Sequence, residues 1–221
     1  SKVTLLGGGG WAIALAKVLY ENGHRVTLWS ALEKEVKSLS EDRENKICLP
    51  GIHIPEEIEI SGDLEYAVKG SEMIVMAVAS SFVRSTSARL KDIIPEGQII
   101  VDVAKGIEDK TFYTMTDIME DEIPTCEAVV LSGPSHAEEV ARKIPTTVVV
   151  GAKKKEVAQK VQSMFGSKYF RTYISPDRKS IELGGALKNV IALAAGIIDG
   201  LGFGDNTEAA LITRGIKEIT A

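Results

Sequence analysis

The sequence has few of the residues that build disulfide scaffolds and metal sites. It contains only two cysteines, Cys48 and Cys126, which lie far apart and lack CxxC spacing, and three histidines that share no ligand spacing. This scarcity excludes a disulfide framework, predicts reduced thiols, and gives no reason to expect a metal. No signal peptide precedes the first expected strand, so we expect a cytoplasmic protein.

The chain also has no excess of positive charge and no long apolar run. The formal net charge is −5, and the one basic run, at 153–155, is followed directly by Glu156. We therefore expect no nucleic-acid partner. The longest helical apolar run, at 190–198, ends at Asp199. It is too short to cross a bilayer, so no membrane span is expected.

A glycine-rich turn stands near the start of the chain. Four glycines at 7–10 follow the apolar run 3–6 and precede a helical pattern. Interpreted as G-x-G-x-x-A, Gly7 makes the turn, Gly9 lets a pyrophosphate approach the backbone, and Ala12 lets the helix pack closely. The free N–H groups of the helix's first turn would face the diphosphate. A flexible surface loop is the alternative interpretation, although the regular flanks favour a dinucleotide site.

Strand and helix signals alternate along most of the chain. Apolar runs predict strands at 3–6, 25–29, 58–60, 73–78, 99–103, 128–131, 147–150 and 170–173. Such alternation with helices predicts an α/β fold with a doubly wound, mostly parallel Rossmann-type sheet. A long helical pattern over 179–201 follows Pro176, with no strand signal after it. We therefore predict a dinucleotide-binding domain over residues 1–175 and the start of an all-α domain over 176–221.

The end of the second expected strand bears on the choice of cofactor. In an NAD-selective site, an Asp or Glu at that point holds the ribose 2′-hydroxyl. Ser30 and Ala31 stand there instead, and Lys34 is the nearest cation. Since no carboxylate is expected to repel a 2′-phosphate, we predict NADP or NAD as cofactor, with NADPH favoured.

Two further loops should meet the glycine turn at the carboxyl ends of the strands, where ligands of such sheets bind. One carries Lys105 and the other spans 132–135. Lys105 could instead be a solvated lysine, and Ser132 and Ser135 could be helix caps. A nucleophilic serine is not expected, because the G-x-S-x-G elbow is absent.

Two adjacent glycines interrupt the last long helical pattern. Gly184 and Gly185 each cost about 1 kcal/mol of helix stability relative to alanine. Small residues one turn before Lys188 would let a ligand or another backbone approach, with the ammonium pointing into the cleft. Tight helix packing beside an exposed lysine is the alternative.

These segments together resemble the bacterial NAD(P)-dependent sn-glycerol-3-phosphate dehydrogenases over essentially the whole chain. The most specific matches are NGH at 22–24 with LW at 28–29, AKGIE at 104–108, LSGPS at 131–135, GGALKNVI at 184–191, DGLGFGDN at 199–206 and ALITRG at 210–215. The resemblance implies reversible NAD(P)H-dependent reduction of dihydroxyacetone phosphate to sn-glycerol 3-phosphate. That reaction would feed glycerophospholipid synthesis.

The resemblance also implies residue roles. Lys188 matches the catalytic lysine, which gives a proton to the carbonyl oxygen as hydride reaches the adjacent carbon. Lys105 matches a lysine that contacts both substrate and cofactor, and Gly133 and Ser135 match positions that contact the substrate. Further cofactor contacts are implied at Gly10, Trp11, Ala31 and Ala137.

The chain departs from the family pattern in two ways. Gly10, Ala12, Ala31, Ala79 and His136 stand where the family usually has Ser, Gly, Arg or His, Pro and Phe, respectively. The chain also ends well short of a family member, so the resemblance implies an incomplete domain for substrate binding and dimerisation. The absent part would carry an aspartate that works with the catalytic lysine and an arginine–asparagine pair that grips the phosphate.

Two alternatives to the enzyme stay open. One is a truncated, catalytically inactive dinucleotide-binding module, and the other is a related β-hydroxyacid dehydrogenase. In each case the apolar run at 190–198 needs cover. Because a large bare apolar patch is rare on a monomer, we expect a homodimer that pairs through the last two helices.

Overall fold

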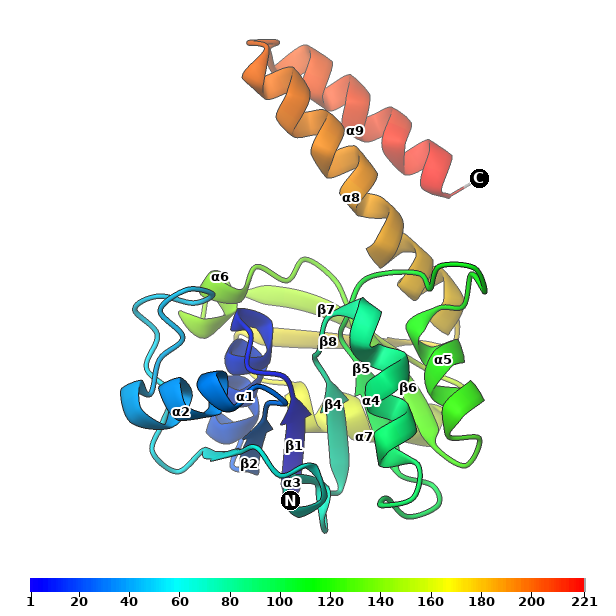
Figure 1. The fold of residues 1–221 in the computed structure, drawn as a ribbon. Coiled ribbons are helices and arrows are strands. Elements are labelled where there is room, and N and C mark those ends of the chain that lie inside the picture. Colours follow the sequence, from blue (N-terminus) through cyan, green and yellow to red (C-terminus); the bar gives the residue numbers. More distant parts are fainter. Residues whose placement is uncertain (221) are drawn as a thin grey trace.

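The computed structural model describes residues 1–220, and its body is an eight-stranded sheet with helices on both faces (Figure 1). The strands are β1 (Lys2–Leu6), β2 (Arg25–Trp29), β3 (Glu59–Ser61), β4 (Met73–Met76), β5 (Ile99–Asp102), β6 (Glu127–Ser132), β7 (Thr146–Ala152) and β8 (Phe170–Ser175). Their order is β3-β2-β1-β4-β5-β6-β7-β8, and each neighbouring pair is parallel except β6 with β7. The prediction of a doubly wound, mostly parallel sheet is confirmed.

The helices divide between the two faces of the sheet. Buried side chains of α1, α6 and α7 form the core on one face, and those of α3, α4 and α5 form the core on the other. The helical elements are α1 (Gly10–Glu21), α2 (Glu33–Asp42), α3 (Leu64–Val68), the 3₁₀ turn η1 (Ser80–Phe82), α4 (Val83–Leu90), α5 (Met115–Glu122), α6 (Ala137–Ala141), α7 (Lys155–Phe165), α8 (Arg178–Gly200) and α9 (Asp205–Ile219).

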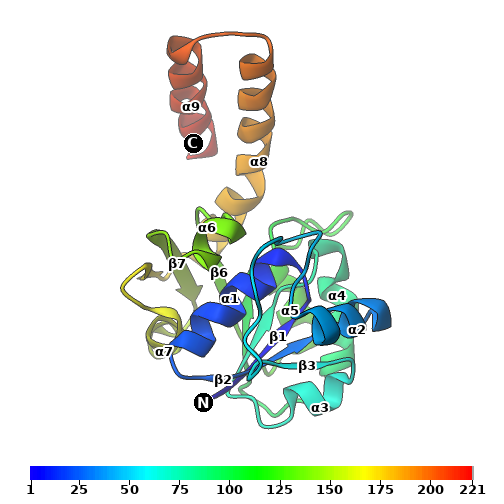
Figure 2. The ribbon, with the colours of Figure 1, turned by 90° about the vertical axis from the view of Figure 1, so that its left-hand side faces the viewer.

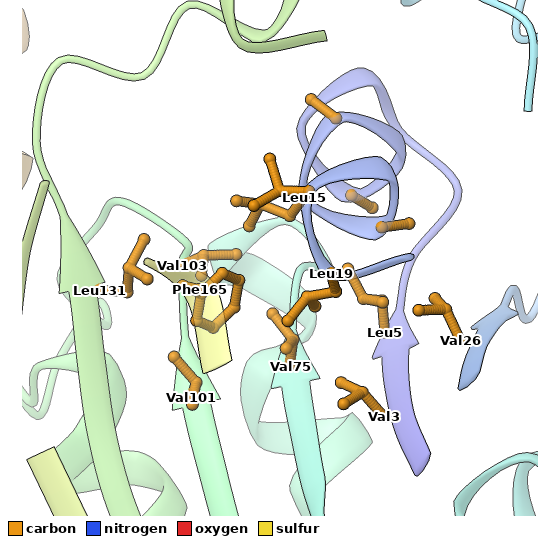
Figure 3. Close-up of a cluster of buried hydrophobic side chains, with 14 of the residues drawn as sticks. Val3, Leu5, Leu15, Leu19, Val26, Val75, Val101, Val103, Leu131 and Phe165 are labelled. Atoms are coloured by element: carbon orange, nitrogen blue, oxygen red, sulfur yellow. The ribbon is translucent and has the colours of Figure 1, made fainter. Parts of the chain in front are cut away.

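Alternation along β1 explains how one strand serves both cores. Val3 and Leu5 pack under α1, as Figure 3 shows, whereas Leu6 belongs to the opposite cluster. Each such side chain contributes about 1.5–3 kcal/mol when fully buried. Thr4 is also fully buried, and its hydroxyl bonds to the carbonyl oxygen of Ala67 at 2.6 Å. A polar residue is therefore tolerated inside the strand, because its hydrogen bond is made.

The last two helices form a hairpin that projects from the body (Figures 1 and 2). The first turns of α8 pack on β6 and β7, and the rest of α8 runs outwards beside α9. Gly215 allows this pairing, because a Cβ there would lie 2.8 Å from the side chain of Ile191. Much of the remaining apolar surface is exposed, at Val190, Leu193, Ile197, Leu201, Phe203, Ile212 and Ile216.

The length of α8 bears on the expectation that the chain does not span a membrane. Its 23 residues are long and apolar enough to cross a bilayer, with a mean hydropathy of 1.6 over an 18-residue window of which 6% is buried. The helix was predicted over 179–201, but the sequence argument weighed only the run at 190–198, and the apolar part of the helix is longer than that run. Length and composition alone leave the expectation unconfirmed.

Candidate functional site

The glycine turn after β1 is held between two neighbouring strand ends. The N–H of Gly7 donates to the carbonyl oxygen of Trp29 at 2.7 Å. Gly7 has φ 134°, and a Cβ there would lie 2.7 Å from the carbonyl oxygen of Ala77. Only glycine fits this conformation and this close approach. At Gly9, by contrast, no atom lies within 4 Å of the Cβ position, so this side of the turn is open.

Helix α1 begins in a way that suits an anion. Its N-cap is Gly9, which provides no side chain to cap the first-turn N–H groups. Such uncapped N–H groups, together with the positive end of the helix dipole, form a favourable place for a phosphate. Trp11 and the buried residues Gly10 and Ala12 make up this first turn.

A cavity of about 520 Å³ opens beside the turn. It is bordered by the ends of β1, β2 and β4 and by one side of α4. Of the residues that the sequence predicted to bind a cofactor, Gly7, Gly9, Ser30 and Ala31 line it. The lining also includes Leu32, Ala79, Phe82, Ser85 and Thr86.

One acidic side chain that sequence reasoning missed also lines this cavity. The Glu35 carboxylate accepts a hydrogen bond from the Ser30 hydroxyl at 2.5 Å. It also lies against the glycine turn, since a Cβ at Gly8 would be 2.6 Å from it. The sequence argument considered only the end of β2, whereas this carboxylate comes from the first turn of the following helix. The end of β2 carries Ser30 and Ala31 in place of a carboxylate, as predicted, but Glu35 brings a carboxylate into the same cavity.

Lys105 lies where β5 ends and bonds to the loop after β6. Its ammonium donates a hydrogen bond to the hydroxyl of Ser135. Ser135 is therefore a partner of Lys105, whereas the N-cap of α6 is His136. Burial, and after it the positive charge of Lys188, lowers the pKa of Lys105. Gly133 lies in the same loop as Ser135, and Ala137 begins α6.

Helix α8 brings Lys188 to this region. A Cβ at Gly185 would lie 2.8 Å from the Ser132 hydroxyl and 3.9 Å from the side chain of Lys105. The glycine thus lets α8 approach the β6 loop, while the space at Gly184 is open. The side chain of Lys188 is exposed, and its Nζ donates to the Asn189 side-chain oxygen at 3.3 Å. The sequence left open whether the two glycines admit a ligand or allow tight helix packing. Tight packing of α8 accounts for Gly185.

Two buried carboxyl groups lie behind Lys105, and the sequence argument missed both. Asp102 is fully buried at the end of β5, and in the part of the chain described its Oδ2 has no hydrogen-bond partner. Burial, and then the charge of Glu182, raises the pKa of Asp102 well above its usual value. Glu182 accepts hydrogen bonds from the backbone N–H and hydroxyl of Thr116, at 2.8 and 2.6 Å. The sequence held one signal for this group, because Asp102 is a charged residue within the apolar run 99–103.

Arg84 fixes the loop that carries Lys105. Its guanidinium bonds to the carboxylate of Glu108 at 2.6 and 2.7 Å, and to Asp121 and Glu122 at 2.7 and 2.6 Å. Three segments are thereby joined: α4, the loop after β5, and α5. The hydrogen bonds from Arg84 lower the pKa of Glu108 to about 2.

The position of the cavity within the sheet indicates what class of protein this is. The chain runs from β1 outwards to β2 and β3, then returns to β4 on the other side of β1. The cavity lies at this reversal, beside the carboxyl ends of the strands, with a glycine turn and an uncapped helix. These features define a Rossmann-type dinucleotide-binding protein.

Comparison with known proteins narrows this class. The family model described as NAD-dependent glycerol-3-phosphate dehydrogenase N-terminus matches residues 2–158, and the corresponding C-terminus model matches 177–221. The chain therefore belongs to the NAD-dependent glycerol-3-phosphate dehydrogenase family, and the resemblance found in its sequence is confirmed.

Individual relatives agree with this family. The chain is 54% identical to the glycerol-3-phosphate dehydrogenase (NAD(P)+) of Fusobacterium nucleatum, over 100% of this chain and 66% of the relative. It is 52% identical to that of Agathobacter rectalis, with the same coverage. The crystal structure of glycerol-3-phosphate dehydrogenase from Coxiella burnetii matches with a TM-score of 0.94 at 32% identity, over 99% of this chain and 67% of that one. The chain thus spans 66% of the length of these two curated relatives.

Proposed function

We propose that the protein reversibly reduces dihydroxyacetone phosphate to sn-glycerol 3-phosphate with NAD(P)H, a reaction that feeds glycerophospholipid synthesis. The observation that carries this proposal is that α8 passes beside Lys105 at Gly185 and brings Lys188 near enough for its charge to lower the pKa of Lys105, at the edge of the sheet that also holds the glycine-turn cavity. The family to which the chain belongs supports it.

The residues at the glycine turn suit a dinucleotide. The open side of Gly9 and the uncapped first turn of α1, formed by Gly10, Trp11 and Ala12, would receive the diphosphate. Gly7 shapes the turn, and contacts to the rest of the cofactor are assigned to Ser30, Ala31, Lys105 and Ala137. When bound, NAD(P)H supplies the hydride.

The two lysines supply what a ketone reduction needs from the protein. Hydride addition to a carbonyl carbon builds negative charge on the oxygen, and a nearby ammonium stabilises that charge. We assign to Lys188 the donation of a proton to this oxygen, and its removal in the reverse direction. Lys105, oriented by Ser135, would hold the substrate oxygen beside it, and Gly133 would contact the substrate through its backbone.

A second candidate is a dinucleotide-binding module without turnover. It is favoured by the exposure of Lys188, whose side chain bonds only to Asn189 among the residues described. The other alternative, a β-hydroxyacid dehydrogenase, has no support from the family match. On either candidate, the domain division at 175/176 stays a prediction.

The two candidates are separated by measuring binding and turnover independently. Nicotinamide fluorescence would report binding of NADH or NADPH, and loss of nicotinamide absorbance with dihydroxyacetone phosphate would report turnover. We expect oxidation of the cofactor that depends on the substrate. Binding without any rate above the uncatalysed one would favour the module, and absence of binding would contradict both candidates.

We also propose that the protein is a cytoplasmic homodimer that does not span a membrane. Val190, Leu193 and Ile197 are exposed at spacings of three and four residues, which is typical of a helix face that packs on protein. The start of α8 is packed on the sheet, with Gly185 against Ser132. Only the part of α8 beyond that contact stands clear of the body. This part is shorter than the ~20 residues that a helix needs to cross a bilayer.

A further inference from the structure

The glycine-turn cavity contains one anionic side chain in a fixed position. The Ser30 hydroxyl accepts the N–H of Leu32 at 3.1 Å and donates to Oε2 of Glu35 at 2.5 Å. This pair of bonds orients the carboxylate between the end of β2 and the glycine turn. Within residues 1–220, the other oxygen, Oε1, has no hydrogen-bond partner and is free to accept one.

The place of this carboxylate matches the part of a dinucleotide that differs between the two coenzymes. In a Rossmann-type site the diphosphate rests on the first helix, and the adenosine ribose lies between the glycine turn and the end of the second strand. Glu35 contacts both of these borders, through Gly8 and through Ser30. A ribose bound there would therefore present its 2′ substituent to a carboxylate.

Two cationic side chains lie in or beside the cavity. Arg89 lines the cavity from α4, and its guanidinium carbon lies 5.1 Å from the centre of the Trp29 ring. Lys34 lines a neighbouring hollow and, in the described part of the chain, is not among the residues of this cavity. Ala31 has no charge. Neither cation is paired with Glu35 within residues 1–220.

We propose that Glu35 makes this protein select NAD(H) over NADP(H), the opposite of the preference expected from the sequence. A 2′-hydroxyl donates a hydrogen bond to the free carboxylate oxygen, whereas a 2′-phosphate would place two or nearly two negative charges beside it. This inference rests on the proposed function, because it requires that the cavity binds a dinucleotide. Glu35 then determines which of the two dinucleotides the cavity binds.

Parallel fluorescence titrations with NADH and NADPH test the selectivity without any need for turnover. We expect NADH to bind about tenfold or more tightly than NADPH, since a juxtaposed like charge costs enough to change affinity by at least that factor. Glu35→Gln should reduce the ratio of the NADPH to the NADH dissociation constant, because it weakens the binding of NADH and strengthens the binding of NADPH. Glu33→Gln removes the same charge from the same helical turn outside the cavity, so it should leave the ratio unchanged.

Two further variants test whether a cation outweighs the carboxylate. Arg89→Gln and Lys34→Gln should change the NADH to NADPH ratio far less than Glu35→Gln does. Equal or tighter binding of NADPH by the unaltered protein, or loss of NADPH binding alone in either cation variant, would overturn the selectivity while leaving the dinucleotide site intact. Binding of neither coenzyme would overturn the proposed function, and the selectivity with it.

Discussion

The ammonium of Lys105 donates a hydrogen bond to the hydroxyl of Ser135, which joins the loop after β5 to the loop after β6. Both loops lie at the carboxyl edge of the sheet, and α8 passes beside them with Gly185 against Ser132. The lysine is thus oriented by a hydroxyl from a different strand-to-helix connection. This arrangement makes the roles proposed for Lys105 and Lys188 open to separate tests.

Lys188→Met is expected to lower kcat for dihydroxyacetone phosphate reduction by about 10²- to 10⁴-fold, the usual contribution of a positioned general acid. NADH binding, measured by fluorescence, should stay unchanged, because Lys188 lies outside the cavity. Lys217→Met, which alters an exposed lysine of α9, is the control and should retain full activity. A Lys188→Met protein with normal kcat would rule out the assigned proton donation.

Ser135→Ala removes the hydroxyl that accepts the hydrogen bond from Lys105. Hydrogen bonds to charged groups contribute about 1.5–3 kcal/mol, so kcat/KM should fall by about 10- to 100-fold. Ser135→Thr keeps a hydroxyl and should restore part of the loss. Steady-state kinetics at several pH values would check this, and an unchanged kcat/KM in Ser135→Ala would show that Lys105 needs no such partner.

The two adjacent glycines of α8 should respond differently to alanine. Gly184→Ala is expected to stabilise the fold by about 1 kcal/mol, because the site is open and alanine favours helix. Gly185→Ala should be less stable than Gly184→Ala, since its Cβ would meet the Ser132 hydroxyl at 2.8 Å and overpacking costs about 1–3 kcal/mol. Urea unfolding of both variants would give the two free energies of unfolding. Equal values would contradict the close approach of α8 to Ser132.

Asp102→Asn should raise thermal stability at neutral pH. Burial raises the pKa of Asp102 above its ordinary 3.8, so the folded state binds the proton more tightly than the unfolded state does. Stability from this group is therefore complete below the unfolded pKa and falls as pH rises above it. Asparagine avoids this loss. Melting temperatures measured across that range should diverge with rising pH, and parallel curves would contradict the assignment.

Leu193→Glu is expected to convert a dimer into a monomer. Leu193 is 68% exposed and belongs to the apolar face of α8 and α9 that we propose as the dimer contact. Ile47→Glu is the matched control, because Ile47 is 92% exposed but lies in a loop far from that face in sequence. Sedimentation velocity reports the change in mass. A clean monomer for the unaltered protein at micromolar concentration would end the proposal.

The sequence by itself determined the order of strands and helices, the glycine turn and the position of Lys105 near the carboxyl edge. These features depend on local periodicity and on residues such as Gly7, whose conformation excludes other side chains. The family was also readable from segments that match residue by residue. All of this information lies in short stretches of chain, so no long-range placement was needed to find it.

Only the tertiary structure decided which side chains from distant segments meet. The antiparallel pairing of β7, the bond from Lys105 to Ser135, and the entry of Glu35 into the cavity each depend on how separate elements are placed. The placement of Glu182 near enough to Asp102 for its charge to raise the pKa of Asp102 has the same origin. Periodicity fixes which face of an element is apolar, but it carries no information on which neighbour that element will approach.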